Sequence, residues 1–409
     1  MKVAIINCGS SSIKYAVFDM TNRDLLGSGL LERIGGSESC LRHRRRNEYG
    51  SYDEILMHEP VGDHVEGFEF ILSVAARMRI LEDPKELLGI GHRVVHGGEL
   101  YDRPVVIDGQ VVDKIRELIP LAPLHNPANI EGIEVAMARL PEVPQVAVFD
   151  TSFHATMPPA AFHYALPYRF YEEQHVRRYG FHGNSHHYVA KRAAALLGRP
   201  LDSLNLITLH LGNGASAAAI QAGKSIDTSM GMTPLEGLIM GTRCGDVDPA
   251  IHGYLHRATG MPLEEVERVL NNLSGLKGIC GSNDMREAGR LADAGDPRAK
   301  LALDMYCYRL KKYIGAYFAA LGRVDAIVFT GGIGENSGRI RAGSCAGLAG
   351  LGIALAGEKN DGASGREAEI QSEQSAVKIL VIPTNEELEI ADHTVTAIKA
   401  WQAGRAVFS

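Results

Sequence analysis

The N-terminal stretch Val3-Ala4-Ile5-Ile6-Asn7-Cys8-Gly9-Ser10-Ser11-Ser12-Ile13-Lys14-Tyr15-Ala16-Val17-Phe18 has the pattern of two β-strands joined by a polar turn. A β-branched apolar run comes before the turn and an alternating apolar run follows it, which predicts a β-hairpin. Gly9 lets the backbone approach a ligand closely, while Ser10 and Ser12 supply small hydroxyl donors. Lys14 adds a positive charge suited to phosphate oxygens. The alternative is an ordinary hairpin with a serine-rich turn.

A second stretch of the same kind lies about half a chain later. Residues 205–209 form an apolar run, residues 210–216 a turn rich in glycine and small side chains, and residues 217–220 a further apolar run. This recurrence predicts two similar halves. Two opposed turns of this kind can hold a polyphosphate, which gives a nucleotide-clamp hypothesis.

Length and composition indicate a two-domain globular protein. A chain of 409 residues is too long for one compact core, and 45% hydrophobic with 22% charged residues is typical of soluble proteins. A formal net charge of −7 argues against a general nucleic-acid binder. No apolar run approaches the ~20 residues of a membrane span, and the first residues lack the features of a signal peptide. The six cysteines form no C-x-x-C pair, so we expect reduced thiols and a cytoplasmic location.

Two charged residues lie in or after predicted buried strands of the first half. Arg93 falls within the strand predicted over residues 87–95, where an unpaired guanidinium is costly, so it needs a protein carboxylate or an anionic substrate as partner. Asp150 directly follows the strand predicted over residues 143–149, a position where α/β enzymes place functional groups. Its alternative role is a cap for the next segment.

The second half contains two further candidate segments. Residues 227–249 form a long stretch without a clear period, yet with too many apolar side chains for disorder, which favours a functional loop. Arg243 in this stretch is a candidate anion contact, with a surface-loop arginine as the alternative. Residues 331–337 follow a buried strand, and their glycines permit backbone approach to a ligand at a helix N-terminus.

Helical periodicity predicts helices over residues 68–81, 129–139, 188–197 and 299–321, and a C-terminal helix that reaches Trp401. The basic cluster at residues 42–46 lacks interleaved aromatic residues and is predicted to be a solvated strand edge or loop. The spacing of His182 and His186 resembles a zinc pair, but Gly183 and Asn184 make a continuous helix doubtful and the glutamate of H-E-x-x-H is missing. We therefore disfavour a zinc site.

Seven segments occur in an order that identifies a family resemblance. They are residues 7–12, 91–98, 178–183, 210–214, 240–243, 332–336 and 383–387. With these segments the chain resembles the acetate, propionate and butyrate kinase family, which belongs to the sugar kinase, heat-shock-70 and actin superfamily. The resemblance covers essentially the whole chain.

The resemblance implies an α/β fold of two actin-like, ribonuclease H-like domains with an internal duplication and a central cleft. The N-terminal domain would comprise residues 1–152 completed by a C-terminal helix in residues 386–409. The C-terminal domain would comprise residues 153–385 and carry the surface of a homodimer.

The implied activity is reversible, Mg²⁺-dependent, direct in-line transfer of the ATP γ-phosphoryl group to acetate, giving acetyl phosphate and ADP. Such an enzyme is a phosphotransferase with a carboxyl acceptor that serves acetyl-CoA biosynthesis, with Mn²⁺ as the alternative cation. The nearest alternative is a propionate or other short-chain acyl kinase. A rival of another class is an ATP-driven clamp or filament protein of the same superfamily, which would need no small-molecule acceptor.

The family's site residues carry over position by position. The metal would be held by Asn7 and Glu386, and Lys14, with Ser10 and Ser12, would contact the nucleotide phosphates. ATP would be held by His210, Leu211, Gly212, Asn213, Gly214, Asp284, Met285, Arg286, Gly332, Ile333, Gly334, Glu335 and Asn336.

The acceptor side carries over in the same way. Arg93 would bind the acetate carboxylate, and Arg243 and His182 would stabilise charge on the transferring phosphoryl group. Asp150 matches the family's active-site acid, and we interpret it as orienting Arg93 or the metal's waters because an ionised carboxylate acceptor needs no general base. The acyl group would meet Val95, Leu124, His125, Phe181 and Pro234.

Two positions depart from the family's pattern. Met285 stands where many relatives have an aromatic or small residue, at the adenine contact. Cys244 replaces a common serine beside Arg243, and a small buried residue is favoured there over an oxidisable thiol.

Overall fold

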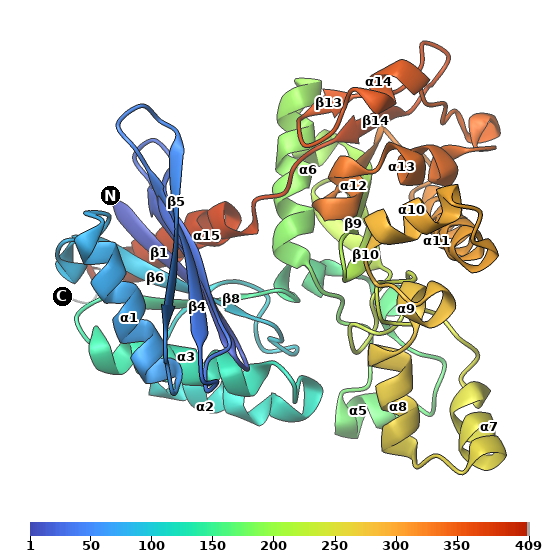
Figure 1. The fold of residues 1–409 in the computed structure, drawn as a ribbon. Helices are drawn as coiled ribbons and strands as arrows, with labels where there is room; N and C mark the ends of the chain where they lie inside the picture. The colour runs from blue at the N-terminus through green and yellow to red at the C-terminus, as the bar shows by residue number, and fades with distance from the viewer. Residues whose placement is uncertain (407–409) are drawn as a thin grey trace. The chain divides into compact units, whose positions relative to one another are not determined.

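The computed structural model describes residues 1–406, which form two compact units. Unit 1 comprises residues 1–152 and the segment that begins at Asn385, and unit 2 comprises residues 153–384. Figure 1 shows each unit as a β-sheet with helices packed on it. No helix within residues 1–406 is both long enough and apolar enough to cross a membrane.

Unit 1 is built on an eight-stranded sheet with the order β5-β4-β3-β2-β1-β6-β8-β7. The first five strands are antiparallel neighbours, whereas β6 and β8 run parallel to β1. The strands are β1 (Lys2–Gly9), β2 (Ser12–Asp19), β3 (Asp24–Glu32), β4 (Ser39–Arg46), β5 (Tyr52–Glu59), β6 (Leu87–Val94), β7 (Val105–Val106) and β8 (Gln145–Phe149).

Helices cover both faces of this sheet because successive strand residues point to opposite sides. Ile6 packs in a core with α1 and α3, whereas the adjacent Ile5 packs in a core with Ile390 and Ile398 of α15. The C-terminal helix therefore completes the core of unit 1, as Figure 1 shows in red. The helices are α1 (His64–Arg77), α2 (Gly109–Glu117), α3 (Asn126–Arg139) and α15 (Glu386–Ala406).

Unit 2 repeats the same strand topology in a six-stranded sheet with the order β11-β10-β9-β12-β14-β13. As in unit 1, a three-stranded antiparallel meander is followed by two strands parallel to its first strand. The strands are β9 (Asn205–Leu211), β10 (Ala215–Gln221), β11 (Lys224–Thr228), β12 (Ala326–Thr330), β13 (Ala368–Glu369) and β14 (Lys378–Val381). The predicted α/β fold of two actin-like domains with an internal duplication is confirmed.

The helices of unit 2 pack on this sheet and extend beyond it. Val189 and Ala193 of α6 lie in one core with Leu206 of β9 and Val328 of β12, and α11 packs against β9 and β10. The helices are α4 (Pro159–Phe162), α5 (Arg169–Gln174), α6 (Gly183–Leu197), α7 (Ala250–Thr259), α8 (Leu263–Asn272), α9 (Gly275–Cys280), α10 (Met285–Asp293), α11 (Pro297–Leu321), α12 (Gly331–Asn336), α13 (Gly338–Cys345) and α14 (Gly357–Asp361).

Local structure differs from the prediction at the start of two helices and agrees with it in one strand. Helix α6 begins at Gly183, five residues earlier than predicted, so Gly183 and Asn184 are helical. His182 lies outside the helix in a left-handed conformation (φ 57°), so no continuous helix carries both His182 and His186. Helix α3 begins at Asn126, three residues earlier than predicted, since the proline at its start is compatible with a first turn. The basic cluster lies in β4, with Leu41 and His43 buried between exposed arginines, as predicted for a solvated strand.

Candidate active site

In unit 1 the candidate residues gather where three neighbouring parallel strands end. Asn7 follows Ile6, which pairs with His92 of β6, and Arg93 follows His92. Asp150 comes directly after β8, beyond the pair of Val94 and Phe149. The carboxyl ends of β1, β6 and β8 therefore bring together an amide, a guanidinium and a carboxylate that the sequence analysis named.

Arg93 and Asp150 form a two-pronged ion pair. Nε of Arg93 donates to Oδ1 of Asp150 at 3.0 Å, and Nη2 donates to Oδ2 at 2.5 Å. The carboxylate is 1% exposed and the arginine side chain 22% exposed. Burial opposes ionisation of Arg93, but Asp150 and Glu386 outweigh it and raise its pKa. The anionic partner that Arg93 was predicted to need is thus Asp150, while the two N–H groups of Nη1 have no protein partner within residues 1–406.

Glu386, the first residue of α15, adds a carboxylate to the same group. Burial raises the pKa of Glu386 to about 7, against an opposing attraction from Arg93. Its Oε1 is buried and has no hydrogen-bond partner in the described part of the chain. The next residue, Glu387, forms an ion pair with Lys14 of the first hairpin. Ser10 lies exposed in the turn of that hairpin, and Ser12 opens β2.

Two asparagines that the sequence analysis missed hold the end of β6 in place. Asn129 of α3 accepts from the Val95 amide at 3.1 Å and donates to the Cys8 carbonyl at 2.9 Å. Asn126 donates to the His96 carbonyl at 3.2 Å. Both side chains are buried. Their spacing of three residues at the start of a helix places both side chains on one face, and this spacing could have identified them from the sequence.

The residues predicted to meet the acyl group differ in exposure. Val95 is half-buried beside Arg93, His125 directly precedes α3, and Leu124 is 78% exposed. In unit 2, Phe181 is 3% exposed and Pro234 is half-buried.

In unit 2 a cavity of about 590 Å³ collects most of the residues predicted to hold the nucleotide. We call it the three-loop cavity, because its walls come from the β9–β10 turn, the start of α10, and α12. It is lined by Gly212, Asn213, Asn283, Asp284, Met285, Arg286, Gly332, Ile333, Asn336 and Ser337. Asn283 and Ser337 were not predicted, although each adjoins a predicted segment.

Short polar contacts fix the walls of the three-loop cavity. The Asn213 carbonyl accepts from the Gly241 amide at 3.0 Å, and its side chain accepts from Asn283 at 3.3 Å. Asp284 caps α10 and forms an ion pair with Arg286 at 2.6 Å, and this contact lowers the pKa of Asp284 to about 2. Met285 is largely buried and presents part of its surface to the cavity.

Other predicted nucleotide residues support the cavity rather than line it. Leu211 and Gly334 are buried, and Oε1 of Glu335 accepts from the Gly331 and Thr384 amides at 2.9 and 3.1 Å. His210 contacts the Ser185 hydroxyl through Nδ1 at 2.7 Å.

Arg243 and His182 converge on the β9–β10 turn. A Cβ atom placed on Gly214 would lie 3.5 Å from Nη1 of Arg243 and 3.5 Å from the ring of His182. The His182 ring also stacks on His210, with 4.3 Å between the ring centroids. Two side chains that lie far apart in the sequence thus meet at one turn, as expected for residues that act on the same group.

Arg243 is half-buried and lacks a carboxylate partner within residues 1–406. Its Nη1 donates to the Pro234 carbonyl at 3.2 Å and contacts the Met240 sulfur at 3.8 Å. Burial lowers the pKa of Arg243, which nevertheless stays charged at neutral pH because guanidinium ionises far above it. An arginine held in this way is prepared to receive an anion.

A hydrogen-bonded network fixes the histidines behind this turn. The Ser216 hydroxyl contacts Nδ1 of His182 at 2.9 Å and Nε2 of His186 at 2.7 Å, and Nδ1 of His186 contacts Thr208 at 2.7 Å. Both ring nitrogens of His186 are therefore engaged by hydroxyl groups. Burial lowers the pKa of His186 well below its ordinary value, so the ring is neutral.

A model of the acetokinase family matches residues 2–392 of the chain. The chain belongs to the acetokinase family. Acetate kinase of Syntrophobacter fumaroxidans is 58% identical to it over 400 residues, which cover 98% of this chain and 97% of that protein. Acetate kinase of Helicobacter pylori is 50% identical over 394 residues, which cover 96% and 97%.

Solved structures of the acetokinase family have the same fold. The crystal structure of Porphyromonas gingivalis acetate kinase aligns with a TM-score of 0.92 at 44% identity, covering 97% of this chain and 99% of that one. A propionate kinase from Francisella tularensis aligns with a TM-score of 0.90 at 43% identity, covering 96% and 98%.

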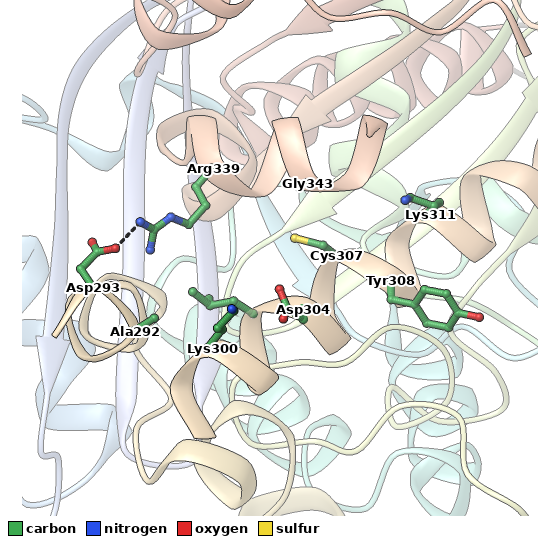
Figure 2. Close-up of a pocket in the computed structure, with 10 residues that line it drawn as sticks. Ala292, Asp293, Lys300, Asp304, Cys307, Tyr308, Lys311, Arg339 and Gly343 are labelled. Atoms are coloured by element: carbon green, nitrogen blue, oxygen red, sulfur yellow. Dashed lines mark hydrogen bonds and ion pairs between the residues drawn. The ribbon is translucent and has the colours of Figure 1, made fainter. Parts of the chain in front are cut away.

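A separate cavity of about 640 Å³ in this acetokinase chain lies among α10, α11 and α13 (Figure 2). Arg339 of α13 donates to Asp293 across it at 2.5 Å, and Cys307 and Lys311 of α11 line its wall. None of the residues named from the sequence lines this cavity, so the three-loop cavity is the better candidate for the nucleotide.

Cys244, the other departure from the acetokinase pattern, is half-buried. Its thiol contacts the Gly245 carbonyl at 3.1 Å, and burial raises its pKa. The thiol is therefore protonated at neutral pH, a poorly reactive form.

Proposed function

We propose that the protein is an acetate kinase, which transfers the γ-phosphoryl group of ATP to acetate and gives acetyl phosphate and ADP in a reversible reaction. The observation that carries the proposal is Arg243, a half-buried guanidinium without a carboxylate partner in the described chain, beside the β9–β10 turn and His182. Family membership and acetate kinases at 50–58% identity support the same reaction.

Unit 2 binds the nucleotide in this proposal. The three-loop cavity receives ATP between Asn213, the Asp284–Arg286 segment and the glycines of α12. Arg243 and His182 then stabilise the negative charge on the equatorial oxygens of the phosphoryl group in flight. Preorganised donors of this kind favour the transition state over the ground state, and such positioning and electrostatics supply most of the acceleration in phosphoryl transfer.

Unit 1 binds the acceptor. Arg93 binds the acetate carboxylate through the N–H groups that Asp150 leaves free, and Asp150 fixes the plane of the guanidinium. Acetate is already ionised at pH 7, so no side chain has to remove a proton from it. Val95, Leu124 and His125 of this unit meet the methyl group.

The residues assigned to the metal fit a hard divalent cation. Mg²⁺ takes oxygen ligands, keeps several waters and needs few protein groups. Oε1 of Glu386 is a buried acceptor that has no donor in the described chain, and Asn7 lies close to the end of β1. Asn7 and Glu386 would hold Mg²⁺, or Mn²⁺ in its place, and Lys14, Ser10 and Ser12 would contact the phosphates. The cation, when bound, neutralises charge on the phosphates.

The remaining assignments follow the family. The enzyme is a cytoplasmic homodimer that dimerises through unit 2, and its product serves acetyl-CoA formation. Size-exclusion chromatography with light scattering measures the dimer directly, and a monomer at micromolar concentration would contradict it.

A hydroxamate assay with the purified protein tests the activity. Acyl phosphate should form only when ATP, acetate and Mg²⁺ are all present, and EDTA should abolish its formation until Mg²⁺ is restored. ATP hydrolysis at the same rate without acetate would overturn the proposal in favour of an ATP-driven clamp protein.

A propionate kinase is the second candidate, because a propionate kinase structure matches this chain almost as well as an acetate kinase structure does. One methylene is worth only about 1–3 kcal/mol of discrimination, so slower propionate turnover is expected in either case. Comparison of kcat/KM for the two acids at equal ATP decides between them: a higher value for propionate would favour the second candidate.

A further inference from the structure

Arg341 is the largest side chain among those that are almost completely buried, at 1% exposure. It lies in α13, and no carboxylate in the described chain forms an ion pair with it. All its hydrogen bonds go to neutral oxygens instead: Nε donates to Oδ1 of Asn360 at 2.8 Å, Nη2 to the Asn360 carbonyl at 2.7 Å, and Nη1 to the carbonyls of Gly334 and Glu335, each at 2.9 Å. Burial lowers the pKa of Arg341.

The two carbonyls that Nη1 holds belong to α12, one wall of the three-loop cavity. This helix has only six residues, so the carbonyls of its last turn lack partners within the helix. A positive charge at the carboxyl end of a helix also complements the helix dipole. Arg341 therefore fixes the end of α12, while Gly332, Ile333 and Asn336 of the same helix face the cavity.

Asn360 of α14 completes the clamp. Its side chain accepts from Arg341 and donates to the Gly338 carbonyl at 2.9 Å, and it is 2% exposed. The Arg341–Asn360 pair thus ties α12, α13 and α14 together. Only a planar guanidinium reaches two adjacent carbonyls and an amide at once, since lysine carries a single nitrogen.

The energetic cost of Arg341 argues for a role in geometry. Asp361 attracts Arg341 without forming an ion pair and offsets only part of the cost of burial. A buried charge that lacks a close counter-ion is usually less stable than a well-packed apolar side chain of similar volume. The fixed position of α12 is what this arrangement gains in return.

We propose that Arg341 is a positioning residue for nucleotide binding: its guanidinium sets the backbone of Gly331–Asn336 in the conformation that receives the nucleotide. The proposal rests on the proposed function only in taking the three-loop cavity as the nucleotide site. It goes beyond that function by assigning a role to a residue that touches no substrate.

The test compares Arg341→Met and Arg341→Lys with the wild type. Affinity for a fluorescent ADP analogue is measured by titration, without turnover, and KM for ATP and for acetate are measured separately. Arg341→Met should weaken ADP binding and raise KM for ATP about tenfold or more, since hydrogen bonds to charged groups are worth about 1.5–3 kcal/mol. KM for acetate should stay within about twofold, and Arg341→Lys should give an intermediate value.

Arg339→Met is the matched control, because Arg339 lies two residues earlier on α13 and is half-exposed against Asp293 (Figure 2). It should leave ADP affinity unchanged. Amide exchange without nucleotide gives a second measurement: Arg341→Met should speed exchange in residues 331–337, and Arg339→Met should not.

The inference is overturned if folded Arg341→Met binds ADP like the wild type, or if its KM values for ATP and acetate rise equally. Should Arg341→Met fail to fold, Arg341→Lys and Asn360→Ala carry the same comparison, and unchanged ADP affinity in both would overturn the inference. Because ADP affinity is read without acetate, a wild type that binds ADP but makes no acyl phosphate would contradict the proposed function and leave this test intact.

Discussion

At the scale of single residues, the two arginines of the candidate site are in different electrostatic states. Arg93 already has Asp150 as its counter-ion, whereas Arg243 donates to a carbonyl, contacts a thioether and has no carboxylate partner in the described part of the chain. An arginine that already has a counter-ion attracts a further anion with a smaller gain in free energy, because its charge is partly neutralised. An unpaired one gains the full attraction, so Arg243 is suited to the charge that develops during transfer.

Arg243→Met should therefore lower kcat by about 100- to 1,000-fold, the usual cost of removing one preorganised donor from a transition state. Arg243→Lys should recover only part of the loss, because a lysine cannot make a forked contact. Steady-state kinetics measures the effect, and Arg268→Met, which removes an exposed arginine paired with Glu265, is the control. A kcat within twofold of the wild type in Arg243→Met would exclude a role in transfer.

Val95→Ala should shift specificity toward the longer acid. Val95 is half-buried beside Arg93, and removal of its two methyl groups makes room for one more methylene of substrate. The ratio of kcat/KM for propionate over acetate should rise about 5-fold or more, within the 1–3 kcal/mol that a methylene is worth. Val105→Ala, at a half-buried position in β7, should not change the ratio. An unchanged ratio in Val95→Ala would contradict the assignment of Val95 to the acyl group.

At the scale of elements, the short helix α9 fixes the loop that carries Arg243 through backbone hydrogen bonds. The start of α9 donates to this loop: the Leu276 amide to the Met240 carbonyl at 3.0 Å, and the Lys277 amide to the Gly241 carbonyl at 3.0 Å. Gly275 makes the approach feasible, because it has φ +62° and a Cβ there would lie 2.2 Å from the Met240 carbonyl oxygen.

Gly275→Ala should therefore displace the Arg243 loop and lower kcat by about tenfold or more, with a loss of a few degrees in Tm from the strained backbone. Gly281→Ala is the control that distinguishes backbone strain from a steric clash. Gly281 also has positive φ, but a Cβ there meets nothing within 4 Å. It should lower Tm with little change in kcat. Equal effects of the two substitutions on kcat would contradict the role of Gly275.

Elements with a strong local signal could be predicted from the sequence, and those fixed by tertiary contacts could not. The hairpin of β1 and β2 and the long helix α11 carry clear periodicity, and both are found. The edge strand β5 was not predicted: its side chains are largely exposed on both faces, so no alternation marks it. The start of α6 depends on the backbone conformation of His182, which no pattern of residue types reveals.

The candidate site shows the same division. Motif residues such as Asn213 and Gly332 could be named from their segments, and the structure places them on one cavity. Arg341, Asn126 and Asn129 escaped notice because their roles depend on carbonyls that the fold brings to them from distant segments. Residues that contact a ligand can be recognised from sequence motifs, whereas residues that position them are harder to recognise.

At the scale of the whole molecule, both units contain neutral buried histidines that make stability depend on pH. Burial lowers the pKa of His92, His96 and His154 to about 4 and that of His186 well below its ordinary value. In the unfolded chain these rings take up protons near pH 6.5. Between pH 6.5 and 4 these histidines make the unfolded state bind more protons. The raised pKa of Glu386 acts in the opposite direction, but one carboxyl offsets only about one of these protons, so stability falls as the pH falls.

Thermal unfolding measured from pH 7.5 to 4.5 should show Tm constant above about pH 7 and falling steadily below 6.5. Each histidine contributes up to about 1.4 kcal/mol per pH unit in that range. His92→Gln should reduce the slope of the unfolding free energy against pH by the amount that corresponds to roughly one proton. A Tm that rises on acidification from pH 6.5 to 5 would contradict this account.

The position of α15 has a consequence for synthesis on the ribosome. Ile390 and Ile398 cover one face of a sheet whose strands lie near the N-terminus and are therefore translated much earlier. The apolar side chains on that face stay exposed to water until the intervening 232 residues of unit 2 and then α15 have been synthesised. A nascent N-terminal half is therefore a natural client for chaperones, and a stop codon shortly before Asn385 would leave it permanently unfinished.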